Sequence, residues 1–208
     1  MDHVPGPFPA SLEIDYPDRE LNRLTTFFRP FTVIPIAIIT GLLSGSTVRT
    51  RSDKYVWGSG GMVFGATVLM LLFRQKYPRW WFDWHLGVTK LGTRVAAYLA
   101  LLRDEYPSTD DEQAVHVAIP YPDAKRDLNR WLPLVKWILA VPHYIVLSFL
   151  GLGAVVCVII AWFAILFTGR YPRSLFEFVV GVLRWSLRVS AYAFLLTTDR
   201  YPPFSVSA

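Results

Sequence analysis

One stretch of the chain, residues 132–169, is almost free of charge and is longer than a lipid bilayer is thick. Its single charged residue is Lys136. A straight helix of that length would extend about 57 Å at about 1.5 Å per residue, whereas the hydrocarbon core of a bilayer is about 30 Å thick. We therefore expect the stretch to fold back at Gly151 and Gly153. This predicts two membrane-spanning helices, 133–150 and 151–168.

A region in the N-terminal half has the same character. Two apolar segments, 31–46 and 55–73, flank the polar residues 47–54, which predicts a second membrane hairpin. Hydrophobic residues make up 53% of the chain and charged residues only 18%, below the roughly 25% charged residues of soluble domains. We expect an all-α integral membrane protein.

The sequence also repeats itself at polar and proline positions, in the same order in both halves. We interpret this self-similarity as a tandem duplication. The matching pairs begin at Tyr16 and Tyr121 (Tyr-Pro-Asp), at Leu21 and Leu128 (Leu-Asn-Arg), at Tyr77 and Tyr171 (Tyr-Pro-Arg), and at Asp104 and Asp199 (Asp-X-Tyr-Pro).

Each copy has one predicted layout: a short strand-like segment, a transmembrane helix hairpin and an amphipathic interfacial helix. The strand-like segments, 12–16 and 115–121, are expected to pair on the cytoplasmic side, because a lone strand would leave its backbone groups dependent on water. The predicted boundaries are an N-terminal tail 1–11, a first repeat 12–107, a linker 108–114, a second repeat 115–204 and a C-terminal tail 205–208.

The start of each hairpin carries one base and one proline at matching positions. Arg29 lies six residues before Pro35, and Lys136 lies six residues before Pro142. We expect the two bases to extend to the lipid headgroups and the two prolines to kink their helices.

The distribution of Lys and Arg predicts the orientation. With four spans and both termini in the cytoplasm, 18 bases lie inside and three lie outside, as the positive-inside rule requires. An even number of crossings in each copy would make the repeats parallel rather than inverted.

Two segments, 79–103 and 173–196, have the periodicity of amphipathic helices. Each places an acid and two bases on one face and apolar, Trp-containing surface on the others. The acids, Asp83 and Glu177, are candidates for a polar pathway. The residues expected to bind anionic lipid or a protein partner are Lys90, Arg94, Arg184, Arg188, Trp80, Trp81, Trp84 and Trp185.

The position of these two segments has two interpretations. In the first, each helix lies in the cytoplasmic interface, with its bases facing anionic headgroups. In the second, each is a third transmembrane helix of its copy. Charges at the middle of the membrane cost about 2.5–3.5 kcal/mol each on insertion scales, so the second arrangement needs an oligomer in which the charges pair or line a water-filled path.

The second copy resembles a known family. The run 166–185, together with Arg188-Val-Ser-Ala-Tyr192 and Asp199-Arg-Tyr-Pro-Pro-Phe204, is similar to the conserved stretch of the bacterial membrane-protein family called domain of unknown function 4389. The resemblance extends over the chain as two tandem copies, the first less regular than the second. It implies a bacterial, specifically actinobacterial, inner-membrane protein, and it implies no activity and no catalytic residue.

The sequence indicates little chemistry. None of the four histidines pairs with another at metal-ligand spacing, and no phosphate loop or nucleophile motif occurs. We expect no metal, no cofactor and no nucleic-acid partner. His143 is expected to be a packed or water-bonded residue rather than a ligand.

Three functions remain open. The first is a non-catalytic accessory or scaffold subunit, or an assembly factor, of a larger membrane complex, binding anionic phospholipid. The second is a small oligomeric transporter or channel, with lipid as a candidate substrate. The third is a lipid-modifying enzyme, which the lack of catalytic motifs disfavours.

Overall fold

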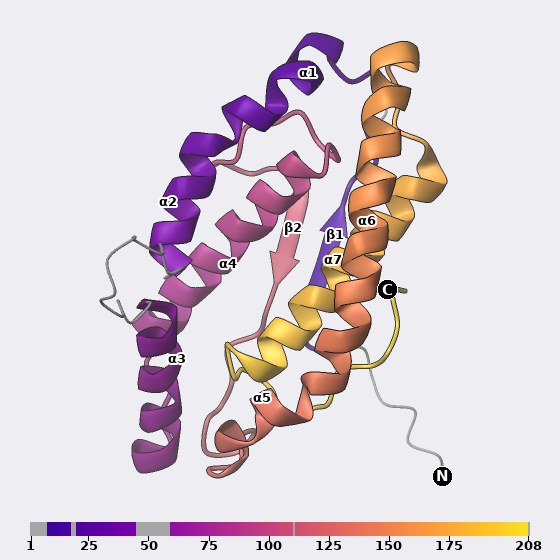
Figure 1. Cartoon of the computed structure of the whole chain (residues 1–208). Helices are drawn as coiled ribbons and strands as arrows, with labels where there is room; N and C mark the ends of the chain where they lie inside the picture. Colours follow the sequence, from indigo (N-terminus) through magenta and orange to yellow (C-terminus); the bar gives the residue numbers. More distant parts are fainter. Residues whose placement is uncertain (1–7, 18–19, 45–58, 110, 208) are drawn as a thin grey trace, which may run out of the picture.

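The computed structural model describes residues 8–17, 20–44, 59–109 and 111–207 (Figure 1). The chain is mostly helical, and its elements follow one another in two similar series. The first series is β1 (Ser11–Ile14), α1 (Arg23–Thr32), α2 (Ile34–Ser44), α3 (Ser59–Leu69), the π-helical turn η1 (Met70–Arg74) and α4 (Arg79–Leu99). The second is β2 (Val115–Ala118), the 3-10 turn η2 (Leu132–Leu134), α5 (Lys136–Leu139), α6 (Val141–Thr168) and α7 (Arg173–Ala193).

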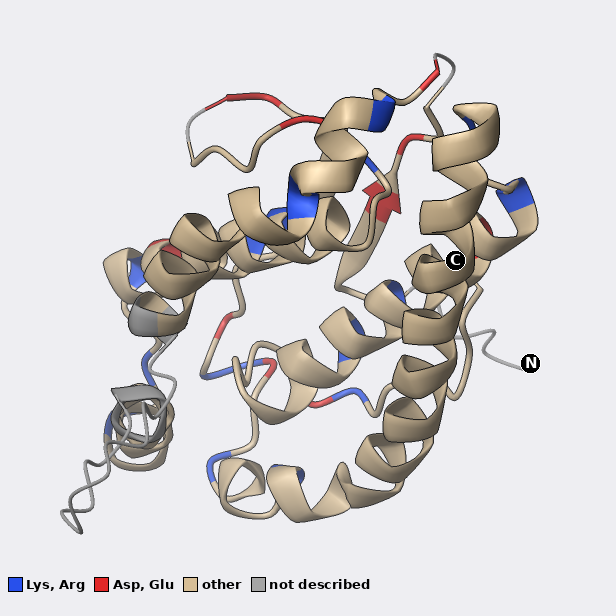
Figure 2. Cartoon of the chain, turned by 45° about the horizontal axis from the view of Figure 1, so that its top comes forward, with Lys and Arg blue, Asp and Glu red and all other residues tan. Residues whose placement is uncertain are grey.

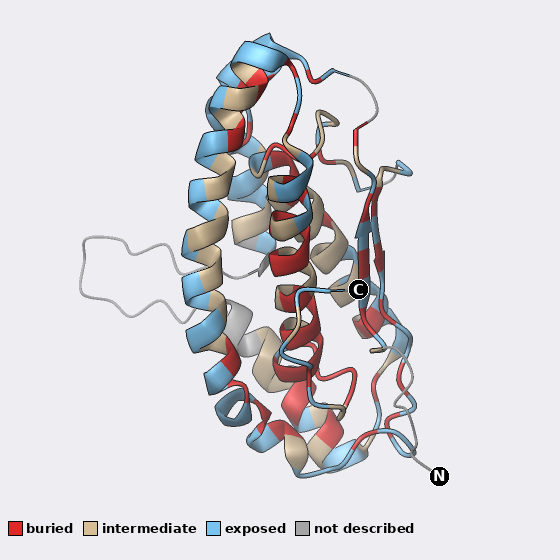
Figure 3. Ribbon diagram, turned by 90° about the vertical axis from the view of Figure 1, so that its right-hand side faces the viewer, coloured by how far each residue is buried: buried red, intermediate tan, exposed pale blue. Residues whose placement is uncertain are grey.

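These elements form three layers. Helices α2, α3 and α6 make one outer layer, α4 and α7 the middle layer, and the two strands the opposite outer layer (Figures 1 and 3). The contacts agree with this order, because α7 packs against both α6 and β1, and α4 packs against both α2 and β2. Helix α7 is the most buried element (Figure 3), with more than half of its residues inside the protein.

The two strands confirm the predicted pairing. Strands β1 and β2 are antiparallel, and Leu12 lies opposite Val117. Burial alternates along both strands, so one face packs on the helices and the other faces outward. Leu12 and Val117 occupy matching positions in the sequence repeat. The pairing is therefore the one that a two-fold axis through this residue pair would produce.

The predicted turn at Gly151 and Gly153 is wrong. Helix α6 runs without interruption from Val141 to Thr168 and ends at Gly169, whose φ is +75°. A glycine inside a helix costs only about 1 kcal/mol relative to alanine, and no polar residue accompanies the two glycines to stabilise a turn. The predicted spans 133–150 and 151–168 are therefore replaced by the short η2 and α5 and one long helix.

Each of the two prolines lies two residues after a break in a helical run, at Val33 and at Ala140, which is where a proline kink is expected. Pro35 is the second residue of α2, and Pro142 is the second residue of α6. Proline is tolerated in the first turn because no hydrogen bond from its nitrogen is needed there. Val33 and Ala140 keep right-handed helical dihedral angles, and each donates its N–H to the carbonyl oxygen four residues earlier.

The hairpin 31–46 and 55–73 is also revised. Helix α1 already begins at Arg23, where the Asn22 side chain accepts hydrogen bonds from the backbone N–H groups of Leu24 and Thr25. Residues 45–58, which include the predicted loop, lie outside the described residues. Helix α3 follows α2 in the same direction instead of returning beside it (Figure 1).

The helical paths of the two halves therefore run in opposite directions. Helices α2 and α3 lead down the left of Figure 1, and α6 leads up the right. This contradicts the expected parallel repeats, because that expectation depended on two crossings in each copy.

Positive φ angles recur at matching positions of the two halves. Gln75 (φ 44°) and Gly169 (φ 75°) precede α4 and α7, and Leu101 (φ 63°) and Leu196 (φ 57°) follow them. The amphipathic segments 79–103 and 173–196 are helical as predicted, although α4 ends at Leu99 and α7 at Ala193.

Candidate functional site

Arg29 does not extend to headgroups as predicted, but lies inside the protein. Its side chain is buried and forms an ion pair with Asp104. Its Nη1 also donates to the backbone oxygens of Tyr98 and Arg103, and its guanidinium carbon lies 4.6 Å from the centre of the Tyr98 ring. The first cation cluster, Arg29, Tyr98 and Asp104, joins the start of the first half to its end.

Lys136 has the same arrangement in the second half, which also corrects its predicted position. Its ammonium lies 2.7 Å from an Asp199 carboxylate oxygen, donates to the Thr198 backbone oxygen at 2.7 Å and lies 5.2 Å from the centre of the Tyr192 ring. We call Lys136, Tyr192 and Asp199 the second cation cluster. Burial lowers the pKa of Lys136, and Asp199 opposes part of that shift.

Both carboxylates also receive a backbone hydrogen bond. The Asn22 N–H donates to Asp104 at 2.9 Å, and the Asn129 N–H donates to Asp199 at 2.5 Å. A base was expected at each hairpin, but its acidic partner was not identified. The signal was present, because both acids open the recurring Asp-X-Tyr-Pro motif. Spacing in the sequence does not reveal that residues so distant in the chain lie together in the fold.

Three of the four predicted lipid-binding bases bind backbone carbonyls of the protein itself. Arg94 donates to the Ser108 oxygen, Arg184 to the oxygens of Leu12 and Val206, and Arg188 to the Ser205 oxygen. These contacts fasten strand β1 and the segments that follow α4 and α7. Lys90 is half-buried on α4. A lipid-binding role for these four bases stays a prediction.

The tryptophans predicted to bind lipid or a partner divide into two groups. Trp80 and Trp84 are exposed on α4, and Trp81 is half-buried and donates to the Thr67 hydroxyl at 2.9 Å. Trp185 is buried and donates from Nε1 to His143 Nδ1 at 3.1 Å. The apolar face of α7 therefore packs inside the protein, not in the acyl boundary, because α6 and β1 cover it.

The two acids predicted to line a polar pathway lie on the surface of the protein, and that role stays a prediction. Asp83 and Glu177 are both exposed, and Glu177 accepts a hydrogen bond from Arg173, four residues earlier on α7. His143 is fully buried and stacks on Phe204, with 4.0 Å between ring centres. This confirms that His143 is a packed residue.

The most distinctive feature is an extended apolar surface on the outer helix layer. Helix α6 contains no Asp, Glu, Lys or Arg (Figure 2), and its buried residues are only His143, Ala161 and Ile165. We define the apolar surface as the following exposed side chains of α1, α2 and α6: Phe27, Phe28, Phe31, Ile34, Ile38, Ile39, Leu43, Ile145, Val146, Phe149, Leu152, Val155, Val156, Ile159, Ile160, Phe163 and Phe167.

Exposure of such an apolar surface to water is unfavourable. Fully burying one Val, Leu, Ile or Phe side chain gains about 1.5–3 kcal/mol, and soluble monomers rarely expose contiguous apolar patches beyond a few hundred Å². Within the described residues, two helical segments are long and apolar enough to cross a membrane by length and composition, Arg23–Gly41 and Val141–Thr168.

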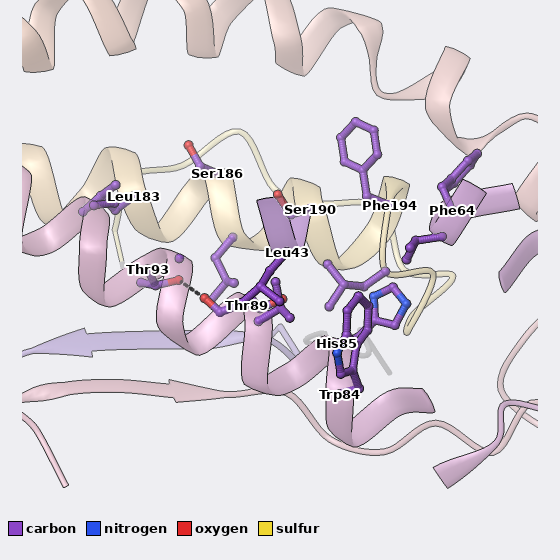
Figure 4. Close-up of a pocket in the computed structure, with 16 residues that line it drawn as sticks. Leu43, Phe64, Trp84, His85, Thr89, Thr93, Leu183, Ser186, Ser190 and Phe194 are labelled. Carbon is purple, nitrogen blue, oxygen red and sulfur yellow. Dashed lines mark hydrogen bonds between the residues drawn. The ribbon is translucent and has the colours of Figure 1, made fainter. Parts of the chain in front are cut away.

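Two adjoining cavities form a groove over the middle layer. The first, of about 660 Å³, is lined by residues of α2, α3, α4 and α7 (Figure 4). The second, of about 570 Å³, lies among α1, α4, α6 and α7, and its wall is almost wholly apolar. Ala96 and Leu183 line both cavities. Each volume is in the range of small-molecule sites, about 300–1,000 Å³.

The first cavity has a few polar groups on its wall. The hydroxyl side chains are Thr89, Thr93, Ser186 and Ser190, from the facing helices α4 and α7 (Figure 4). His85 lies at one end beside Trp84, and burial lowers the pKa of His85. An apolar wall with scattered hydroxyl groups suits an acyl chain better than a charged ligand.

Within the described parts of the chain, no group of three or more His, Cys, Asp or Glu residues is placed to hold a metal ion. Cys157 lies in α6 as a free thiol.

The second half of the chain matches a known family. Residues 131–205 match the family model described as domain of unknown function (DUF4389). The matched range begins just before η2 and ends after α7, so it supports the predicted resemblance for one copy. No curated protein matches the chain, and no solved structure matches it.

Proposed function

We propose that this chain is a non-catalytic membrane protein, held in lipid by its apolar surface. The observation that carries the proposal is α6, a charge-free helix of 28 residues of which three are buried. The core helix of a soluble protein would be covered by other elements. In a lipid phase, the exposed apolar side chains of this helix have no unfavourable contact with water.

Its role is that of an accessory or scaffold subunit, or an assembly factor, of a larger complex in the bacterial plasma membrane, with both termini cytoplasmic. One feature supports this role. Two of the bases predicted to act at a site, Arg184 and Arg188, instead bind backbone oxygens of the protein itself. The exposed Trp80 and Trp84 remain available to a partner.

The chain is further proposed to be a tandem duplication of the unit that the family model matches once. The two cation clusters, the paired positive φ angles and the antiparallel strands support a common origin of the two halves.

A second candidate function is lipid handling, as a lipid carrier or a subunit of a lipid transporter. The groove between α4 and α7 favours it, because the groove adjoins the apolar surface and is lined mainly by apolar side chains.

Purification from native membranes in a mild detergent, with mass spectrometry of the eluate, tests the accessory role. The proposal expects other membrane proteins in a constant ratio to this chain. A Trp80→Ala/Trp84→Ala variant should lose them, and an Ile38→Ala control on the apolar surface should keep them. A chain that elutes without protein but with bound lipid would contradict the accessory role and favour lipid handling.

A further inference from the structure

The orientation of the protein in lipid follows from the relation between α6 and the sheet. The axis of helix α6 is nearly parallel to the axes of the two antiparallel strands, and α6 and the strands lie on opposite sides of α7 (Figures 1 and 3). Any orientation that carries α6 across a bilayer therefore carries the sheet to the same depth.

The sheet is unsuited to that depth. Its outward face bears Glu13 and His116, both exposed, and Asp15 lies 3.6 Å from His116 just beyond the strand. One acid near the middle of a bilayer costs about 2.5–3.5 kcal/mol on insertion scales. A two-stranded sheet also has two outer edges, and unpaired backbone groups in hydrocarbon cost several kcal/mol each. The sheet therefore requires water.

The apolar surface can lie in lipid and the sheet in water if α6 lies flat. We propose that the protein lies on one face of the membrane, with α6 in the membrane plane, the apolar surface in one leaflet and the sheet in water. This inference rests on the proposed function, because it specifies how the same apolar surface contacts the bilayer.

The dimensions agree with this arrangement. One leaflet contributes about 15 Å of hydrocarbon, half of the whole core, and a helix with its side chains is about 10–12 Å wide. Helices that lie in the interface penetrate about 5–10 Å. The single outer layer of helices therefore fits within one leaflet, and the middle layer of α4 and α7 lies above it.

Charged and aromatic residues at the ends of α6 support the same orientation. Arg170 and Arg173 are exposed beyond its C-terminal end, and Arg130 lies exposed before α5 at the other end. Trp131, next to Arg130 in the chain, and Trp137 in α5 are exposed. Bases and tryptophans favour the headgroup level, and a flat helix places both ends at that level of one leaflet.

Single-cysteine labelling tests the inference. In a Cys157→Ala background, four variants report separate places: Ser174→Cys beyond one end of α6, Lys125→Cys beyond the other, Ser11→Cys on the sheet and Val156→Cys on the apolar surface. All four native positions are exposed in the protein. A membrane-impermeant maleimide is applied to spheroplasts and to inside-out vesicles of the expression host.

The flat orientation expects Ser174→Cys, Lys125→Cys and Ser11→Cys to be labelled in the same preparation, and Val156→Cys to be labelled only after detergent is added. Labelling of Ser174→Cys in one preparation and of Lys125→Cys in the other would show that α6 spans the bilayer. That result would overturn the inference and leave the proposed function intact. Labelling of Val156→Cys without detergent would overturn both.

Discussion

The Lys136 ammonium lies 2.7 Å from the Asp199 carboxylate, and this pair joins the helix that begins the second half to the segment that ends it. Arg29 and Asp104 form the corresponding pair in the first half. Both bases are fully buried, and each contacts a tyrosine ring of α4 or α7. The first and second cation clusters therefore join the start of each half to its end in the same way.

Removing the acid from the second cation cluster should lower the stability of the protein. Asp199→Ala leaves the buried ammonium without its counter-charge, and breaking a buried pair in this way costs about 3 kcal/mol or more. The double variant Lys136→Met/Asp199→Ala should recover most of that loss. Denaturant unfolding in mild detergent measures each value. Glu177→Ala is the matched control, since its exposed pair with Arg173 contributes about 0.5 kcal/mol or less. Equal losses of unfolding free energy in Asp199→Ala and Glu177→Ala would contradict a stabilising role of the second cation cluster.

The same lysine predicts a dependence of stability on pH. Burial lowers the pKa of Lys136 below its ordinary 10.5, so the folded protein releases this proton at a lower pH than the unfolded chain does. Stability contributed by this group should rise with pH between the folded and the unfolded pKa. Lys136→Arg does not titrate in this range and lacks the effect. The melting temperature of the wild type should therefore rise relative to that of Lys136→Arg as pH increases toward 10.5. A difference that stays constant with pH would contradict the prediction.

Two glycines at matching positions should respond oppositely to alanine. A Cβ atom on Gly181 would lie 2.7 Å from the Val206 oxygen, whereas one on Gly87 meets nothing within 4 Å. Gly181→Ala should cost about 1–3 kcal/mol by overpacking and release the C-terminal segment from α7. Gly87→Ala should gain up to about 1 kcal/mol from helix propensity. Thermal unfolding compares them, and a loss in both variants would contradict the assigned contact.

Filling the groove should reduce bound lipid. Ala96 lines both cavities, so Ala96→Phe should obstruct the passage between them and lower the lipid that copurifies in detergent. Ala37→Phe, on the exposed side of α2, adds the same ring outside the groove and should leave the lipid content unchanged. Quantitative lipid analysis measures both. Unchanged lipid in Ala96→Phe would remove the support for lipid handling.

The sequence predicted the apolar and the two amphipathic helices, because each depends on local periodicity. It predicted the pairing of the strands because a lone strand leaves its backbone groups without partners. It failed at Gly151, since a glycine in an apolar run fits a turn and a continuous helix equally well, and packing against α7 decides between them. It also assigned Arg29, Lys136 and Arg184 to headgroups. Asp104 is 75 positions from Arg29, Thr198 is 62 from Lys136, and Leu12 and Val206 are 172 and 22 from Arg184. No local pattern reveals these partners.

Membrane fractionation tests the central claim most directly. Cells that express the chain are broken, and the membranes are washed with high salt and then with alkaline carbonate before detergent is added. The apolar surface predicts that the wild-type protein stays in the membrane pellet through both washes and dissolves only with detergent, because salt weakens charge contacts and not apolar burial. Recovery of folded, monomeric protein in the supernatant without detergent would contradict the account.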